Sequence, residues 1–227
     1  MTEFFQKYPE YWGDWSARLL AGALLSVQLS VVGFALAIVL GSLLVWALRS
    51  HQQGLKRLAA GFIQFMRTVP LLALLLALYF AMPGFGLTLS GYQVGILALG
   101  LQGAAYVAEI LRGGLNALHH GQREAAIAVG LTPFSAFTSV ILPQVFRSIL
   151  PPLLNTYVST LKDSSLCALI AIGELMLTAK AIASETFLPM HIFLLVGLVY
   201  FVIAFPLSML SRALEKRFSR GRKILGS

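Results

Sequence analysis

The stretch that decides the fold is Leu19–Leu48, which reads LLAGALLSVQLSVVGFALAIVLGSLLVWAL and contains no charged residue. A helix needs about 20 predominantly apolar residues to cross the hydrocarbon core of a bilayer. At about 1.5 Å per residue, a helix over this stretch is longer than that core is thick. We therefore expect a first membrane span that tilts or projects from the bilayer.

The composition of the whole chain agrees with a membrane protein. Of its 227 residues, 58% are hydrophobic and 11% are charged, and the mean hydropathy is +0.81. Soluble domains carry about 25% charged residues, so an ordinary soluble enzyme is excluded. We predict an all-α polytopic membrane protein with about five spans, of which the further four cover roughly Leu58–Met82, Tyr92–Leu111, Ile149–Ile172 and His191–Leu210.

The distribution of the net charge of +8 predicts the orientation of these spans. Basic residues gather in the loop Arg49–Arg57, in the polar stretch after the third span and in the C-terminal tail. Five spans place all three regions on one side, which the positive-inside rule makes the cytoplasmic side. The N-terminus is then outside. Basic clusters that border apolar spans also argue against a nucleic-acid partner.

Three segments follow from this topology. Residues 1–18 are expected to form an outer interfacial segment anchored by its tyrosines and tryptophans. Residues 19–210 form the transmembrane domain, which includes a cytoplasmic loop at 112–148, and residues 211–227 form a basic cytoplasmic tail. The stretch Gly173–Pro189 is expected to be a loop on the outer side.

The sequence lacks the motifs of the common catalytic and cofactor sites. It has no phosphate-binding loop ending in Gly-Lys-Ser or Gly-Lys-Thr, no His-Glu-x-x-His and no Gly-x-Ser-x-Gly. We expect no catalytic residues, no metal and no cofactor bound by this chain. Any transport against a gradient must draw its energy from a partner or from an ion gradient.

The cytoplasmic stretch 121–143, GQREAAIAVGLTPFSAFTSVILP, predicts two short helices joined by a sharp turn. Ala125 and Ala126 favour the first helix, and Gly130 is suited to end it. Thr132 followed by Pro133 is typical of the start of a second helix. Small side chains on these helices allow another protein to approach closely.

The spacing Glu124-Ala-Ala, three residues, Gly130, nine residues, Val140-Ile-Leu-Pro143 resembles the signature loop of ABC-importer membrane subunits. Those subunits carry Ile where this chain has Val140. The resemblance implies coupling helices that dock into a cleft of an ATPase subunit. The implied coupling residues are Gly121, Glu124, Ala125, Ala126, Gly130, Pro133, Leu142 and Pro143.

Three further motifs narrow the resemblance to permease subunits of polar amino-acid ABC importers, the histidine, glutamine, arginine, glutamate and opine group. They read RTVPLL at 67–72, AYVAEILRGG at 105–114 and LKDSSL at 161–166. The resemblance covers roughly residues 16–217. It implies the type I importer permease fold and a location in the cytoplasmic (inner) membrane of a bacterial-type cell, in contact with membrane lipid.

The same resemblance implies the mechanism and the partners. Substrate, a polar amino acid, arrives on an external solute-binding protein and crosses by alternating access. Two ABC ATPase subunits, which use ATP and Mg, drive the cycle through the coupling helices. A second permease subunit, either identical or related, completes the complex.

Charged residues within the predicted spans are candidates for the translocation path. Lys162 and Asp163 are expected near the middle of the fourth span, where a charge costs at least about 2.5–3.5 kcal/mol. They either pair with other helices or, with the hydroxyl of Ser164, contact a zwitterionic substrate. Adjacent residues cannot face the same spot on a helix, and we favour Asp163 as the one that faces the cavity.

Arg67 lies in the second span just before Pro70, which frees the carbonyl of residue 66 and predicts a kink. Arg67 either reaches the membrane surface or free carbonyls, or it contributes a gate or a substrate contact. Glu109 and Arg112 are spaced to pair on one helix face.

Two other classes of protein compete with this interpretation. A stand-alone ion-coupled secondary transporter could use Arg67, Lys162 and Asp163 to relay protons. Five spans are few for such a protein, and the sequence shows no inverted repeat. A membrane scaffold would not need charges inside the bilayer. Dependence on an ATPase distinguishes the importer from both.

Overall fold

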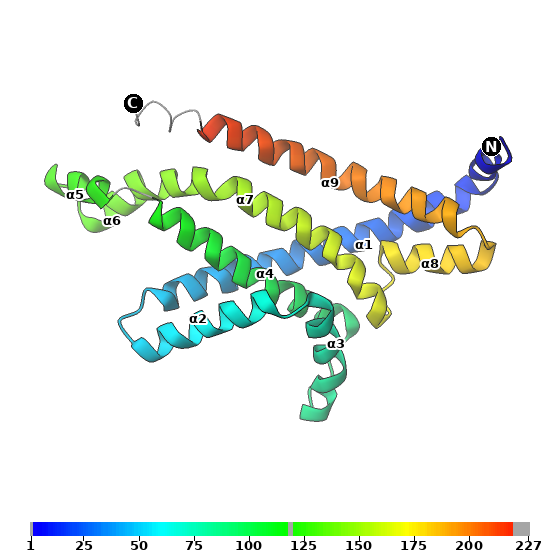
Figure 1. Cartoon of the computed structure of the whole chain (residues 1–227), viewed down its shortest axis with the longest axis horizontal. Helices are drawn as coiled ribbons and strands as arrows, with labels where there is room; N and C mark the ends of the chain where they lie inside the picture. The colour runs from blue at the N-terminus through cyan, green and yellow to red at the C-terminus, as the bar shows by residue number, and fades with distance from the viewer. Residues whose placement is uncertain (1, 118–119, 220–227) are drawn as a thin grey trace.

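The computed structural model describes residues 2–117 and 120–219, and these residues form helices joined by short links (Figure 1). Nine α-helices are described: α1 Thr2–Leu48, α2 Gln53–Thr68, α3 Leu71–Ala81, α4 Gly91–Asn116, α5 His120–Ala128, α6 Pro133–Ala136, α7 Leu142–Asp163, α8 Leu175–Thr186 and α9 Pro189–Ser219. Short 3₁₀ segments at Met82–Phe85 and Ser164–Ile170 and a π-helical turn at Phe137–Ile141 complete the order.

The number of possible membrane spans agrees with the sequence prediction. Four described helical segments are long and apolar enough to cross a bilayer, and the bent pair α2 and α3 can make a fifth. The four segments are Lys7–Leu48, Gly91–Asn116, Pro133–Ile170 and Pro189–Phe218. The predicted all-α polytopic class is confirmed.

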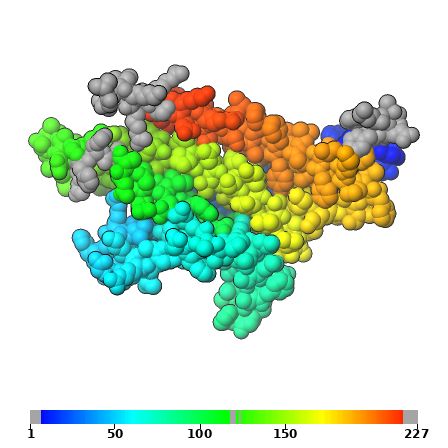
Figure 2. All heavy atoms as spheres, in the orientation of Figure 1, coloured from blue at the N-terminus to red at the C-terminus, as the bar shows by residue number. Residues whose placement is uncertain are grey.

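Several of the connections lie at the two ends of the bundle (Figure 1). The link between α1 and α2, the α5–α6 segment and the C-terminal end of α9 lie at one end. The N-terminus and α8 lie at the other, while α3 projects sideways from the body (Figures 1 and 2). Three basic regions separated in sequence therefore share one end of the molecule.

The core is built on close packing of α1 against α4. A Cβ atom added at Gly41 of α1 would lie 2.7 Å from Cγ1 of Val107 and 3.0 Å from the carbonyl oxygen of Ala104. Only a residue without a side chain allows the two backbones to come this close. Small residues at helix contacts are the usual means of association where lipid removes the hydrophobic driving force.

The second span is broken more sharply than a proline kink within one helix. α2 ends at Thr68, α3 begins at Leu71, and the two axes differ by 106°. Pro70 has no N–H group, so Met66 lacks its helical donor and the helix stops. The amide nitrogen of Gln102 on α4 donates to the carbonyls of Val69 at 2.8 Å and Met66 at 3.5 Å. These bonds give donors to two carbonyl groups that the break leaves without a helical partner.

The prediction of a loop over Gly173–Pro189 is wrong, because the segment contains α8. Leu175, Ala179 and Ile182 recur at helical spacing and are buried against α1 and α9. Glu174 begins the helix: its buried carboxylate accepts from Leu177 N at 2.9 Å, and from the hydroxyls of Ser26 and Tyr200 at 3.1 Å each. The charges of this segment obscured its apolar periodicity in the sequence.

The helix α1 continues through residue 18 without interruption, so the expected N-terminal segment is not a separate element. Trp15 is fully buried, stacks on Tyr11 at 5.1 Å between ring centroids and packs against α8 and α9. Trp15 is therefore a core residue in this structure. Nearby, Arg18 forms a two-point ion pair with Glu185 of α8, and this contact lowers the pKa of the Glu185 carboxyl.

The fourth span differs from the expected Ile149–Ile172. α7 begins at Leu142, follows directly on the α6 and π-helical turns, and ends at Asp163. Lys162 and Asp163 lie in the last turn of α7, before the 3₁₀ segment Ser164–Ile170. Their expected position near the middle of the membrane stays a prediction. The polar and proline-containing stretch before Ile149 is helical, which shifts the span toward the N-terminus.

Candidate functional site

The α5–α6 segment, which we define as residues 120–143, is shaped by two local signals. α5 ends at Ala128, and the turn after it contains Gly130, whose φ of +89° lies in the left-handed region. Leu131 N donates to Ala126 O and Gly130 N to Ile127 O, the bonding pattern of a Schellman C-cap. Thr132 then caps α6 by accepting from Ser135 N at 3.2 Å, with Pro133 in the first turn. The predicted helix, turn and helix are confirmed.

The α5–α6 segment presents apolar side chains at one end of the molecule. Ala126 and Ala136 are buried and hold its two short helices together. Val129 and Phe134 are 78% and 76% exposed on either side of the turn. Of the residues that the family resemblance singled out, Gly121, Glu124, Ala125, Gly130, Pro133, Leu142 and Pro143 are all exposed. An exposed apolar pair on a capped turn is suited to binding another protein.

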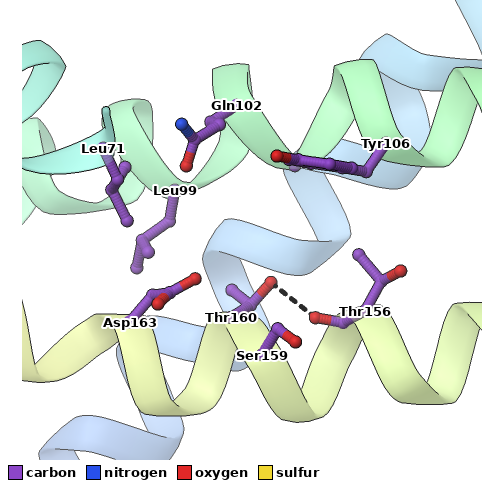
Figure 3. A pocket seen from close by; sticks show the side chains of 9 residues that line it. Leu71, Leu99, Gln102, Tyr106, Thr156, Ser159, Thr160 and Asp163 are labelled. Carbon is purple, nitrogen blue, oxygen red and sulfur yellow. Dashed lines mark hydrogen bonds between the residues drawn. The ribbon is translucent and has the colours of Figure 1, made fainter. Parts of the chain in front are cut away.

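A second candidate region is a pocket of about 270 Å³ between α4 and α7 (Figure 3). Leu99, Gln102 and Tyr106 line it from α4, and Leu71 contributes from the start of α3. The wall on α7 consists of Thr156, Ser159, Thr160 and Asp163. The volume lies just below the roughly 300–1,000 Å³ of drug-sized sites, so the pocket suits a small polar molecule.

The structure separates the charged residues that the sequence grouped as one candidate path. Asp163 is half-buried and directs its carboxylate into the pocket (Figure 3). Lys162 and Ser164 do not line the pocket: Lys162 is exposed, and Ser164 is buried and donates to Leu161 O at 2.7 Å. Arg67, at the end of α2, does not line the pocket either.

Arg67 belongs instead to a cluster of charges between α2 and α4. Its guanidinium lies 3.9 Å from the Glu109 carboxylate, which accepts a 2.6 Å hydrogen bond from Arg112. The predicted pairing of Glu109 with Arg112 is confirmed. The three side chains are partly exposed, so the cluster links two helices without burying an unpaired charge.

Sequence reasoning missed Gln102 and the hydroxyls of α7. Gln102 is an amide within an otherwise apolar stretch of α4, and such an isolated polar residue in a span is a signal of function. Ser159 and Thr160 each lie three or four residues from both Thr156 and Asp163, which places the four residues on one helix face. Only the packing of α4 on α7 shows that these residues face each other.

The pocket and the α5–α6 segment are connected through the helices that form the pocket walls. α4 ends at Asn116, shortly before α5 begins at His120, and α7 continues directly from the segment. At about 1.5 Å per residue, α7 spans roughly 33 Å from Leu142 to Asp163. The segment therefore lies close in the chain to the helices of both walls. Such an arrangement can couple a partner bound at one end to a small molecule held in the pocket.

Comparison with known proteins identifies similar chains. Residues 33–220 match the family described as binding-protein-dependent transport system inner membrane component. A probable amino-acid ABC transporter permease protein, y4tG of Sinorhizobium fredii, is 36% identical over 87% of this chain and 85% of its own length. The glutamine transport system permease protein GlnP of Escherichia coli is 33% identical over 90% of this chain and 97% of its own.

A solved structure has the same architecture. The crystal structure of an amino acid ABC transporter with histidines superimposes with a TM-score of 0.84 at 30% identity. The match covers 94% of this chain and 98% of the solved chain. The similarity therefore extends over both candidate regions.

Proposed function

The chain belongs to the family of binding-protein-dependent transport system inner membrane components, and from this we propose that it is the permease subunit of an ATP-driven importer of polar amino acids. It is a multi-pass protein of a bacterial inner membrane. The full-length similarity to permeases of ABC importers favours this function over a stand-alone ion-coupled transporter.

The observation that carries the proposal is the exposed α5–α6 segment, continuous with both walls of the pocket. In the proposed complex the segment docks on an ATPase subunit, which alone uses ATP and Mg. This chain binds no metal or cofactor and has no catalytic residue. The docking residues are those of the resemblance, Gly121, Glu124, Ala125, Ala126, Gly130, Pro133, Leu142 and Pro143.

The proposed orientation places the α5–α6 segment and the basic residues near it in the cytoplasm. Residues 112–148 then form the cytoplasmic coupling loop, residues 211–227 the cytoplasmic tail and residues 1–18 the outer segment. The end that carries the N-terminus and α8 receives substrate from an external binding protein. A second permease subunit, identical or related, is needed because each ATPase of a pair engages one docking segment.

The continuity of the elements supports alternating access as the mechanism. Closure of the ATPase pair moves the α5–α6 segments, and α4 and α7 transmit that motion to the pocket between them. Asp163 is the proposed path residue that contacts substrate. Lys162, Ser164 and Arg67 support the path from outside the pocket, Arg67 through its contact with Glu109.

Mutation of the exposed docking surface tests this function. We expect Val129→Asp combined with Glu124→Lys to lower recovery of the ATPase with the tagged chain by at least about tenfold. Amino-acid uptake in cells should fall with it, while membrane insertion is retained. The matched control is Phe187→Asp, which places the same charge on an exposed phenylalanine directly after α8, the helix at the opposite end of the molecule.

The control should recover the ATPase at the wild-type level. If the docking variant imports amino acids at the wild-type rate without a bound ATPase, the importer function is wrong and the ion-coupled transporter is supported.

A further inference from the structure

The polar side chains that line the pocket between α4 and α7 are one carboxylate, one amide and four hydroxyls. Of its nine lining residues, Asp163 carries the one formal charge, and none of the nine is Lys, Arg or His. The polar side chains alone do not settle what the pocket binds, because amides and hydroxyls can both donate and accept. The hydrogen bonds that these side chains already make decide whether they can still donate to a ligand or can only accept from it.

The amide of Gln102 is oriented by the break between α2 and α3. Its nitrogen donates to the carbonyls of Val69 and Met66, at 2.8 and 3.5 Å, and carbonyls accept only from the NH₂ side of an amide. The oxygen of the same amide is left facing the pocket, on the side of α7 (Figure 3). The helix break thus makes Gln102 an acceptor toward the pocket.

The hydroxyl groups of the two α7 threonines also donate to backbone carbonyls. Thr160 donates to the carbonyl of Thr156 at 3.0 Å, and Thr156 donates to the carbonyl of Pro152 at 2.9 Å. A hydroxyl has one proton, so each of these offers only lone pairs to the pocket. Thr160 is buried and cannot exchange its partner freely with water.

We propose that this pocket selects cationic amino acids, those with an ammonium or guanidinium side chain, and that Gln102 is a specificity-determining residue for them. The proposal rests on the proposed function. Acceptors on two walls and one carboxylate match a ligand that brings several donors and a net positive charge. The α-carboxylate that every amino acid carries can accept from the hydroxyls of Tyr106 and Ser159. A second carboxylate on the ligand side chain would lie in a pocket that holds Asp163 and no cation, which is costly away from water.

The test is direct binding to the purified full chain in lipid nanodiscs, without the external binding protein, so that selection by the permease itself is measured. The probe is radiolabelled L-arginine, competed with unlabelled L-arginine, L-glutamine and L-glutamate. We expect L-glutamine to compete at least about tenfold more weakly than L-arginine, and L-glutamate more weakly still. Competition by L-glutamate as strong as that by L-arginine overturns the proposal.

Two variants of nearly equal size separate recognition by Gln102 from its structural role. Neither Gln102→Glu, as the carboxylate, nor Gln102→Met can donate to the carbonyls of Val69 and Met66, but the glutamate keeps an oxygen for the pocket. We expect Glu to retain the preference for L-arginine over L-glutamine and Met to lose it by at least about tenfold. Equal loss in both variants would show that Gln102 only holds the helix break, and would overturn its role in specificity.

Gln28→Met is the matched control, since Gln28 is an exposed glutamine of α1 outside the pocket. It should bind L-arginine as the wild type does. Asp163→Asn should lower L-arginine affinity more than L-glutamine affinity, because it removes the charge and keeps the shape. These readings do not require an ATPase. If the wild-type chain binds no ATPase, the proposed function is contradicted. The specificity of the pocket is decided separately, by the amino-acid binding data.

Discussion

Gly130 determines the geometry of the docking segment at the scale of one residue. Its φ of +89° lies where a residue with a Cβ atom is strained, and its N–H and that of Leu131 close the end of α5. A Cβ atom at this position would meet no neighbouring atom within 4 Å, so the restriction is conformational and not steric. The left-handed conformation costs a side-chain-bearing residue about 1–2 kcal/mol.

This leads to a prediction for the ATPase interface. Gly130→Ala should weaken ATPase binding by roughly 5–30-fold, because about 1–2 kcal/mol is needed to keep the turn in its docking shape. Gly130→Asn should retain most of the affinity, since asparagine tolerates the left-handed region. Titration of purified ATPase against the chain in nanodiscs measures both. Equal losses would mean that the size of the side chain, and not its conformation, matters at the interface.

At the scale of elements, the contact of α1 with α4 depends on the absence of side chains at a few positions. A Cβ atom at Gly41 would lie 2.7 Å from Val107 and 3.0 Å from the Ala104 carbonyl, so the two helices would have to separate. Gly61 of α2 has no such neighbour within 4 Å. The same substitution therefore has opposite expected effects on the two helices.

We expect Gly41→Ala to destabilise the folded chain by about 1–3 kcal/mol, the typical cost of overpacking. Gly61→Ala should be neutral or stabilise by up to about 1 kcal/mol, because alanine is the better helix former. Thermal unfolding of the two variants in the same detergent compares them directly. A lower unfolding temperature for Gly61→Ala than for Gly41→Ala would contradict the packing of α1 on α4.

At the scale of the whole molecule, the two ends of the bundle carry different elements. The α5–α6 segment, proposed to dock on the ATPase, and the link between α1 and α2 lie at one end, and α8 lies at the other (Figure 1). The pocket lies between them, with walls formed by the two helices that flank the docking segment. In the proposed function, each copy of the chain therefore supplies one docking segment, the α5–α6 segment.

From this we predict equal numbers of permease and ATPase subunits in the purified complex. Native mass spectrometry of the complex, extracted gently from its host, should give two of each, with the permeases either identical or a related pair. Two ATPases on a single permease chain would contradict the assignment of one docking segment to each ATPase. The masses also distinguish a second copy of this chain from a related partner.

Local patterns in the sequence were sufficient for the class of fold and for the helix, turn and helix of the α5–α6 segment. Apolar runs such as Leu19–Leu48 require a membrane whatever their neighbours are, and Gly130 and Thr132–Pro133 act on the backbone beside them. Only the tertiary structure decided which distant polar groups meet: Gln102 with the end of α2, Asp163 with the α7 threonines around one pocket, Glu174 with Ser26 and Tyr200. The physical reason is that a side chain's free donors and acceptors depend on how helices pack, and neither helical periodicity nor charge encodes that packing.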